Sequence, residues 1–173
     1  MSVKVLFVCY GNICRSPVAE FLFRSMADAE GLSGSITCES CATSDENAGC
    51  RVDPRSARVL SEHGISCEGK RARRITDGDF RSFDYIVCMD RMNLRFLERI
   101  RPRECKAEVS MLLDHAGGGE VDDPWYTGDF DKAYEEIERG CAGLLREIRE
   151  REGLRCAFSS QYGCPAARPW TPS

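Results

Sequence analysis

The sequence predicts an α/β fold in which a single domain holds a four-stranded parallel sheet with helices on both faces. Segments with strand patterning alternate with segments of helical patterning along the chain, which is typical of a parallel sheet with helical crossovers. The segment Val3–Cys9 is almost continuously apolar, as expected for a strand buried on both faces. A chain of 173 residues is long enough for one such domain with a substantial core.

The first strand, Val3–Cys9, is followed by a short turn and a helix. Ser16 is a residue type preferred as a helix N-cap and Pro17 is preferred at the first helical position, so we expect the helix to begin there. One apolar stripe at helical spacing is formed by Ala19, Leu22, Phe23 and Met26. Gly31 is expected to end this helix.

Three further strands are predicted, at Ser35–Ala42, Phe83–Met89 and Ala107–Leu112. They are short apolar runs between polar or glycine-containing segments. The segments Thr43–Val52 and His115–Gly128 are expected to be loops.

Three further segments have helical patterning. The first begins at Asp53-Pro54 and stops at Gly64, and the second, Met92–Ile100, is broken at Pro102. The third, Phe130–Arg151, has an apolar side formed by Tyr134, Ile137, Cys141, Leu144, Leu145 and Ile148. Residues after Arg155 lose this periodicity, so we divide the chain into a domain at 1–154 and a flexible tail at 155–173.

The composition argues against two classes of partner. The chain has 24 basic and 28 acidic residues and a formal net charge of −4, so it lacks the excess of basic residues typical of nucleic-acid binding. No apolar run approaches the ~18 residues that cross a membrane. We therefore expect neither a nucleic-acid partner nor insertion into a membrane.

The eleven cysteines indicate neither a disulfide framework nor a metal site. Their number is odd and the chain is too long to need disulfides for stability, which favours a reducing, cytoplasmic location. Cys38 and Cys41 have the spacing of zinc ligands, but there is no second such pair, and only His63 and His115 could complete a site. In a strand the two thiols would face opposite sides, so we predict no metal and no cofactor.

The chemistry that the sequence predicts is concentrated in the segment Cys9–Pro17. A buried strand brings Cys9 to the C-terminal edge of the sheet, where α/β folds bind ligands. The following residues return to a helix N-terminus, so backbone N–H groups and the helix dipole can together form an anion site. Gly11 and Asn12 are types that tolerate left-handed backbone angles. We therefore predict an N-terminal phosphate-binding loop.

The side chains of this loop are suited to nucleophilic attack on a phosphate. Positive surroundings favour the thiolate form of a cysteine such as Cys9, which is the nucleophilic form. Arg15 can bind two phosphate oxygens with its planar guanidinium, and Ser16 can hydrogen-bond the thiolate. Attack by Cys9 on phosphorus would form a phosphocysteine and release an oxygen that needs a proton.

The best candidate for this proton donor is Asp123, which precedes Pro124 in the loop after the fourth strand. In a parallel sheet that loop leaves from the edge that carries Cys9. Once ionised, Asp123 could also activate water against the phosphocysteine. Asp122 is the alternative for this role.

The combination of Cys9–Ser16 with the segment Asp123-Pro124-Trp125-Tyr126 resembles the low-molecular-weight protein tyrosine phosphatases, and the resemblance covers residues 3 to 152. It implies hydrolysis of phosphotyrosine in proteins and of small aryl phosphates. It implies Cys9 as nucleophile, Arg15 as phosphate clamp and Asp123 as general acid and base.

The resemblance extends to supporting residues. Asp90 is similar to the aspartate that holds the phosphate-loop arginine, and Cys14 to a second cysteine that forms a reversible disulfide with the nucleophile. Asn12 and Ser16 are implied to support the loop by hydrogen bonding. The residues expected to bind substrate are Tyr10, Gly11, Asn12, Ile13, Cys14, Ser16, Glu46, Trp125 and Tyr126.

Three positions depart from the family pattern. Tyr10 stands where Leu is common, and Glu46 stands where an aromatic wall of the substrate cleft is usual. Lys70 stands where many relatives carry a His that supports the loop. We therefore expect one side of the substrate slot to be acidic and open.

Other interpretations of the same residues stay open. Asp90 can also be read as a helix cap, and Trp125 and Tyr126 as loop packing. A thioredoxin-coupled arsenate reductase would need a close cysteine partner for Cys88, which is absent. A protein-arginine phosphatase would carry Thr in place of Ile13, and a phosphopeptide-binding module without catalysis would have lost the thiol or the acid. The sequence gives no indication of an oligomeric state.

Overall fold

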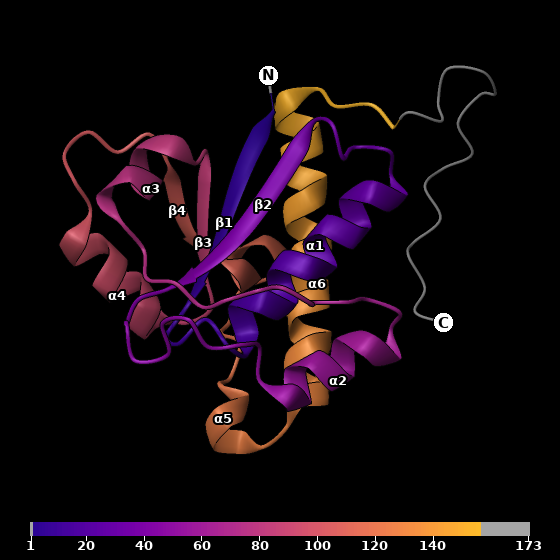
Figure 1. The fold of residues 1–173 in the computed structure, drawn as a ribbon. Coiled ribbons are helices and arrows are strands. Elements are labelled where there is room, and N and C mark those ends of the chain that lie inside the picture. The colour runs from indigo at the N-terminus through magenta and orange to yellow at the C-terminus, as the bar shows by residue number, and fades with distance from the viewer. Residues whose placement is uncertain (1, 157–173) are drawn as a thin grey trace.

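The computed structural model describes residues 2–156, which form the α/β fold that the sequence predicts. Four parallel strands make one sheet in the order β2-β1-β3-β4 (Figure 1). The strands are β1 (Val3–Cys9), β2 (Ile36–Ala42), β3 (Tyr85–Cys88) and β4 (Glu108–Met111). Apart from residues 155 and 156, the predicted tail at 155–173 lies outside the described residues.

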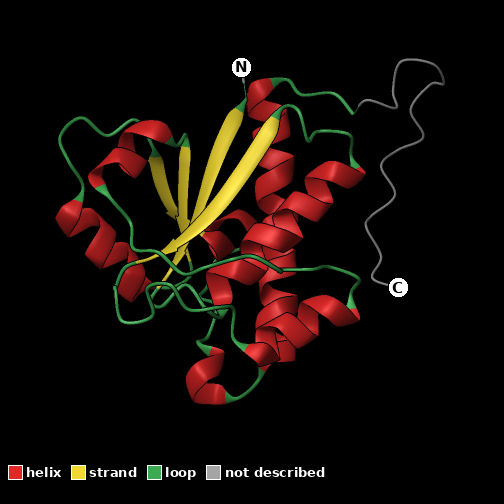
Figure 2. Ribbon diagram, viewed as in Figure 1, coloured by secondary structure: helices red, strands yellow, loops and turns green. Residues whose placement is uncertain are grey.

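Helices cover both faces of this sheet, as predicted (Figures 1 and 2). On one face lie α1 (Arg15–Ala29), α2 (Pro54–Glu62) and α6 (Phe130–Glu152), and on the other lie α3 (Asp77–Ser82) and α4 (Arg91–Ile100). Strand β1 supplies both cores, because Val5 and Phe7 pack with α1 and α6 while Leu6 and Val8 pack with α3 and α4. This alternation explains why β1 is apolar at nearly every position.

The same alternation separates the two cysteines that have zinc-ligand spacing. Cys38 is buried in the core beneath α1 and α6, and Cys41 is buried in the core beneath α3 and α4. The described residues contain no group of three or more side chains that could hold a metal ion. No helix among them is long and apolar enough to cross a membrane.

Three short helices were not predicted from the sequence. They are α3, the 3-10 helix η1 (Leu112–Ala116) and α5 (Pro124–Thr127), and the last two lie where we expected a strand end and a loop. Each is too short for apolar residues to repeat at helical spacing. In α3 the start is fixed by a reciprocal pair of hydrogen bonds between Thr76 and Asp79, which is a purely local signal.

Hydrogen bonds at the C-terminal edge of the sheet gather the loops around the end of β1. The Thr43 N–H donates to the Cys9 carbonyl at 2.9 Å, and the Ser44 N–H donates to the Tyr10 carbonyl at 3.1 Å. The Val121 N–H donates to the Met89 carbonyl at 3.0 Å and so brings the segment before α5 beside the end of β3. Loops from distant parts of the sequence therefore meet at the C-terminal end of β1, and Figure 1 shows them gathered below the sheet.

Helix η1 packs against α6 at a point where the backbones approach closely. A Cβ atom added to Gly143 would lie 1.9 Å from the carbonyl oxygen of His115. This contact holds the buried His115 ring between the Ser110 hydroxyl, 2.9 Å from Nε2, and the Glu147 carboxylate, 2.5 Å from Nδ1. Position 143 therefore has no room for a side chain, and only glycine fits there without movement of the backbone.

We expect Gly143→Ala to destabilise the protein by about 1–3 kcal/mol, because the backbone of η1 would have to move. In a helix free of such contacts the same change would stabilise by up to about 1 kcal/mol, so the sign of the effect is diagnostic. Urea unfolding measures it. The exposed Ala142→Gly in the same turn is the control and should lose about 1 kcal/mol through helix propensity alone. A Gly143→Ala protein as stable as wild type would contradict the close packing.

Candidate active site

One cleft at the C-terminal edge of the sheet collects most of the predicted site residues. It is lined by Cys9, Tyr10, Gly11, Ile13, Cys14, Arg15, Glu46, Asn47, Asp123, Trp125 and Tyr126. Of the residues predicted to act in catalysis or substrate binding, Asn12 and Ser16 do not line it, because both are buried beneath the loop. Asn47 lines the cleft although no feature of the predicted loop at 43–52 distinguished it.

The loop after β1 depends on one left-handed residue. Asn12 has a φ of 58°, and it is the one non-glycine residue of the described chain with a positive φ. Its side chain is fully engaged, because Nδ2 donates to the hydroxyls of Ser16 and Ser40 and Oδ1 accepts from the Arg73 N–H. Gly11, the other residue of a type that tolerates left-handed angles, does not have a positive φ. A Cβ there would lie 2.6 Å from the side-chain nitrogen of Asn47.

Two donors reach the sulfur of Cys9, which is 2% exposed. The Asn12 N–H donates to Sγ at 3.3 Å, and the Ser16 hydroxyl lies 3.0 Å from Sγ. Hydrogen bonds of this kind stabilise a thiolate relative to a thiol. The sulfur at the floor of the cleft therefore lies against an N–H group and a hydroxyl.

Ser16 is not the helix cap that the sequence predicts. Helix α1 begins at Arg15, with Cys14 at the N-cap position and no side-chain capping hydrogen bond. The Ser16 hydroxyl accepts from Asn12 and has one proton, which it can donate to Cys9 Sγ or to the Cys41 carbonyl at 3.3 Å. The hydroxyl therefore forms its hydrogen bonds with Asn12, Cys9 and Cys41, and it makes none with the N–H groups at the start of α1.

A buried polar cluster supports the loop from behind. The Ser40 hydroxyl, which accepts from Asn12, donates to the Glu20 carboxylate at 2.7 Å. Lys70 Nζ lies 3.0 Å from the same carboxylate and donates to the Ser40 carbonyl at 2.7 Å. Lys70, at the position where the resemblance implied a histidine, therefore lies behind the loop. Sequence reasoning missed Glu20 and Ser40, although Glu20 is a buried charge one turn after Ser16 on α1.

Arg15 is 2% exposed and faces three groups. Its Nη1 donates to Asp90 at 2.7 Å and to the Val121 carbonyl at 2.8 Å, and its Nη2 lies 3.5 Å from Asp123. Burial alone would lower the pKa of Arg15, but the nearby charges of Cys9, Asp123 and Asp90 outweigh it and raise that pKa. The guanidinium therefore stays charged beside the sulfur.

Asp90 has both of the roles that the sequence left open, because it contacts Arg15 and also caps a helix. Its Oδ2 accepts from Arg15, while its Oδ1 accepts from the Asn93 N–H at 2.8 Å as the N-cap of α4. One carboxylate therefore holds the helix start and orients the arginine.

The two candidate acids have different environments. Asp123 lines the cleft with Cys9, and its Oδ1 accepts from the Trp125 N–H at 3.0 Å as the N-cap of α5. Asp122 does not line the cleft, and its carboxylate accepts from Lys132 Nζ at 3.2 Å on the surface. The geometry favours Asp123 over Asp122 as the group that can reach a bound phosphate ester.

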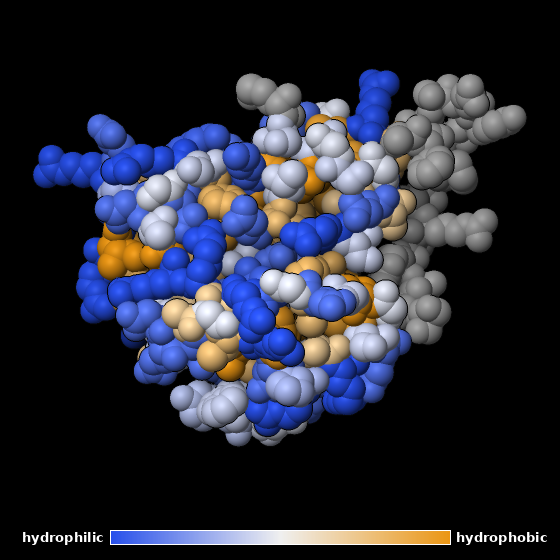
Figure 3. All heavy atoms as spheres, viewed as in Figure 1, coloured by the Kyte–Doolittle hydropathy of each residue, from blue (hydrophilic) through white to orange (hydrophobic). Residues whose placement is uncertain are grey.

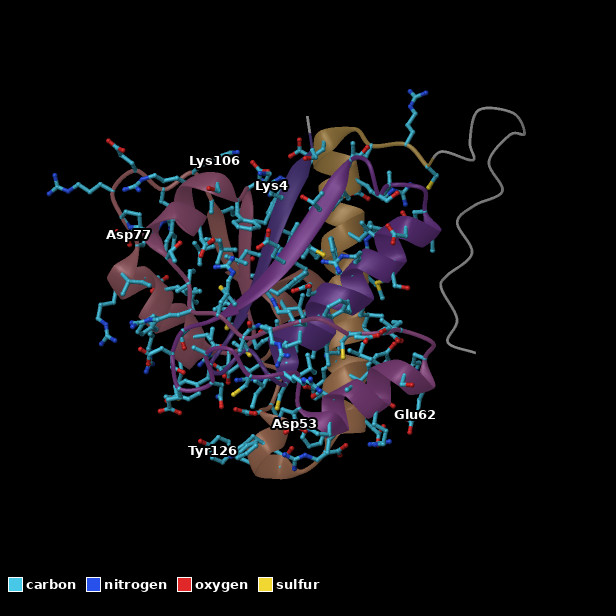
Figure 4. All side chains as sticks on the ribbon, viewed as in Figure 1. Lys4, Asp53, Glu62, Asp77, Lys106 and Tyr126 are labelled. Atoms are coloured by element: carbon cyan, nitrogen blue, oxygen red, sulfur yellow. The ribbon has the colours of Figure 1, made fainter. Side chains whose placement is uncertain are left out.

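The mouth of the cleft is aromatic. Trp125 and Tyr126 of α5 are 57% and 83% exposed, and Tyr126 lies at the lower end of the molecule in Figure 4. The surface at this lower end, where α5 lies in Figure 1, is of intermediate hydropathy in Figure 3. Arg55 of α2 lies over the ring of Trp125 at 5.4 Å and is held by Asp53 through two hydrogen bonds. Sequence reasoning missed Arg55, because only the fold brings α2 beside α5.

Cys14, the predicted redox partner of Cys9, is a buried free thiol in the wall of the cleft. Burial and the nearby charge of Asp53 raise the pKa of Cys14 to about 12, so it is protonated at neutral pH. Its disulfide with Cys9 stays a prediction.

Comparisons with known proteins agree with this geometry. A family model described as low molecular weight phosphotyrosine protein phosphatase matches residues 4–153. The protein of that name from Sus scrofa is 41% identical over 152 residues, which cover 84% of this chain and 96% of the relative. The crystal structure of YfkJ from Bacillus subtilis has a TM-score of 0.84 at 35% identity and covers 88% of this chain and 98% of its own. Drosophila arginine phosphatase has a TM-score of 0.80 at 29% identity, with 85% and 98% covered.

Proposed function

Because this chain belongs to the low molecular weight phosphotyrosine protein phosphatase family and is a phosphotyrosine phosphatase, we propose that Cys9, Arg15 and Asp123 carry out its reaction. The observation that supports this proposal is that a buried thiol, a buried guanidinium and a carboxylate line one cleft. The reaction is hydrolysis of the phosphate ester through a phosphocysteine intermediate.

In the first step the Cys9 thiolate attacks phosphorus while the bond from phosphorus to the phenolic oxygen breaks. Arg15 binds the equatorial oxygens, using Nε and Nη2, because Nη1 already donates to Asp90 and Val121. Asp123, as a carboxylic acid, donates its proton to the leaving phenolic oxygen.

In the second step Asp123, now a carboxylate, accepts a proton from a water molecule that attacks the phosphorus of the phosphocysteine. The bond from phosphorus to sulfur breaks and inorganic phosphate leaves. The Asn12 N–H and the Ser16 hydroxyl stabilise the departing Cys9 thiolate.

The shape of the cleft supports an aromatic substrate. The sulfur lies at a nearly closed floor, and the exposed rings of Tyr10, Trp125 and Tyr126 stand at the mouth. A phenyl phosphate is long enough to reach the floor while its ring packs between these side chains. A phosphoserine side chain is shorter and offers no ring to them.

The proposal is tested by comparing matched peptides that carry phosphotyrosine, phosphoarginine or phosphoserine, with arsenate reduction assayed in parallel. We expect kcat/KM for phosphotyrosine to exceed the others by about a hundredfold. A preference for phosphoarginine would instead indicate the activity named for the Drosophila neighbour, despite Ile13 in the cleft wall.

We also propose that the enzyme works in the cytoplasm. A thiolate nucleophile requires reduced sulfur, and Cys9 and Cys14 in the cleft are free thiols.

A further inference from the structure

We propose that Glu46, held in place by Tyr10, makes this enzyme prefer phosphotyrosine sites flanked by Arg or Lys. The inference rests on the function proposed above and concerns which phosphotyrosine proteins the cleft accepts.

Tyr10 and Glu46 form one wall of the cleft as a fixed pair. The Tyr10 hydroxyl donates to Glu46 Oε1 at 2.7 Å. The Tyr10 carbonyl in turn accepts from the N–H of Ser44 at 3.1 Å and from its hydroxyl at 3.0 Å. The loop after β2 is therefore tied to the residue next to the nucleophile through both backbone and side chain.

The Tyr10 phenol stays protonated as a donor in this pair. Its hydrogen bond to the Glu46 carboxylate, followed by partial desolvation, raises the pKa of Tyr10. A protonated phenol leaves the negative charge on Glu46, at the mouth of the cleft.

Glu46 differs from Asp123, the other carboxylate that lines the cleft, because Asp123 lies 3.5 Å from Arg15. Three carboxylates outside the lining also lie beside cations. Asp53 is paired with Arg55 at 2.9 Å, Asp122 with Lys132 at 3.2 Å, and Asp45 with Arg74 at 3.9 Å. Within residues 2–156, Glu46 has no ion pair with Lys or Arg. On the side of the mouth formed by Trp125 and Tyr126, Arg55 lies over the Trp125 ring and is itself paired with Asp53. Glu46 is thus a carboxylate in the cleft wall that has no cation partner, and an incoming peptide meets its charge.

A bound phosphotyrosine places its phosphate near Cys9 and leaves the peptide backbone at the mouth. Residues on either side of the phosphotyrosine then lie over the rim, where Arg or Lys can contact Glu46 and where Asp or Glu is repelled. The contact is exposed to solvent, so its effect is modest and is reduced by salt.

The test uses three phosphotyrosine peptides that differ only at the two flanking positions, which are Arg, Ala or Glu. For wild type we expect kcat/KM to fall from Arg to Ala to Glu, with a two- to fivefold difference, about that of an exposed ion pair, between Arg and Glu. The difference should lie mainly in KM and shrink at about 1 M salt. In Glu46→Gln, which keeps an acceptor for the Tyr10 hydroxyl, the ratio of Arg to Glu peptides should approach one.

Asp45→Asn is the matched control, because it removes one charge from the same loop at a residue that does not line the cleft. It should keep the wild-type ratio, and a loss equal to that of Glu46→Gln would overturn the assignment to Glu46. Tyr10→Phe should lower the ratio by releasing Glu46, and a full ratio there would overturn the positioning role of Tyr10. Equal kcat/KM for all three peptides in wild type would overturn the preference alone, whereas failure to hydrolyse any of them would overturn the proposed function.

Discussion

Replacing Cys9 by Ser is expected to lower the turnover of aryl phosphates by a factor on the order of 10⁵ or more, as for the loss of other covalent nucleophiles. A serine hydroxyl is not ionised at neutral pH, so it would need a base. Neither His63 nor His115 lines the cleft, so neither is placed to act as that base. The proposed mechanism therefore depends on a thiolate, which a serine at position 9 does not supply.

Steady-state kinetics and peptide binding together test this prediction. Cys9→Ser should still bind a phosphotyrosine peptide in calorimetry, since Arg15 and the loop are unchanged. Cys50→Ser, at an exposed cysteine outside the cleft, is the control and should keep full activity. Turnover by Cys9→Ser within about tenfold of wild type would exclude Cys9 as the nucleophile.

Replacing Asp123 by Asn is expected to slow hydrolysis of phosphotyrosine by about 10²–10³-fold, which is the range for loss of a general acid. The amide oxygen can still accept from the Trp125 N–H, so the start of α5 should be preserved. The loss should be much smaller for aryl phosphates with acidic phenols, because these leave without a proton.

A series of aryl phosphates with phenols of graded acidity measures this dependence. The slope of log kcat against phenol pKa should be steeper in Asp123→Asn than in wild type. Asp122→Asn removes the neighbouring carboxylate, which contacts Lys132, and should behave like wild type. If Asp123→Asn cleaves a phosphotyrosine peptide at the wild-type rate, the acid assignment is wrong.

The fold was largely predictable because its main signals are repeated along the chain. Strand β1 is apolar on both faces, and α6 repeats its apolar residues over several turns, so neither depends on one position. The short helices α3, η1 and α5 begin at local capping contacts, and their sequences are too short to repeat apolar residues at helical spacing. Ser16 shows that the preference of serine for the N-cap position can be overridden by a tertiary contact, since its hydroxyl contacts the Cys9 sulfur and not the helix N-terminus.

The candidate site was predictable where one segment contains the chemistry, as in Cys9 to Ser16. It was not predictable where tertiary contacts bring single residues from separate segments. Arg55 comes from α2, and Ser40 from the end of β2, and no local pattern marks either as part of the site. Lys70 was noticed only as a departure from a family pattern, and its partner Glu20 became evident only in three dimensions.

Arg15, the first residue of α1, connects this helix to two other parts of the chain. Its guanidinium donates to Asp90, just after β3, and to the carbonyl of Val121, in the segment before α5. One side chain therefore fixes both the proposed phosphate site and the segment that carries Asp123, the proposed proton donor. A lysine at position 15 would carry all its donors on one nitrogen atom and could not face both sides at once. We therefore expect substitutions that change substrate preference to be tolerated at the exposed rim and not at Arg15, whose contacts hold three segments together.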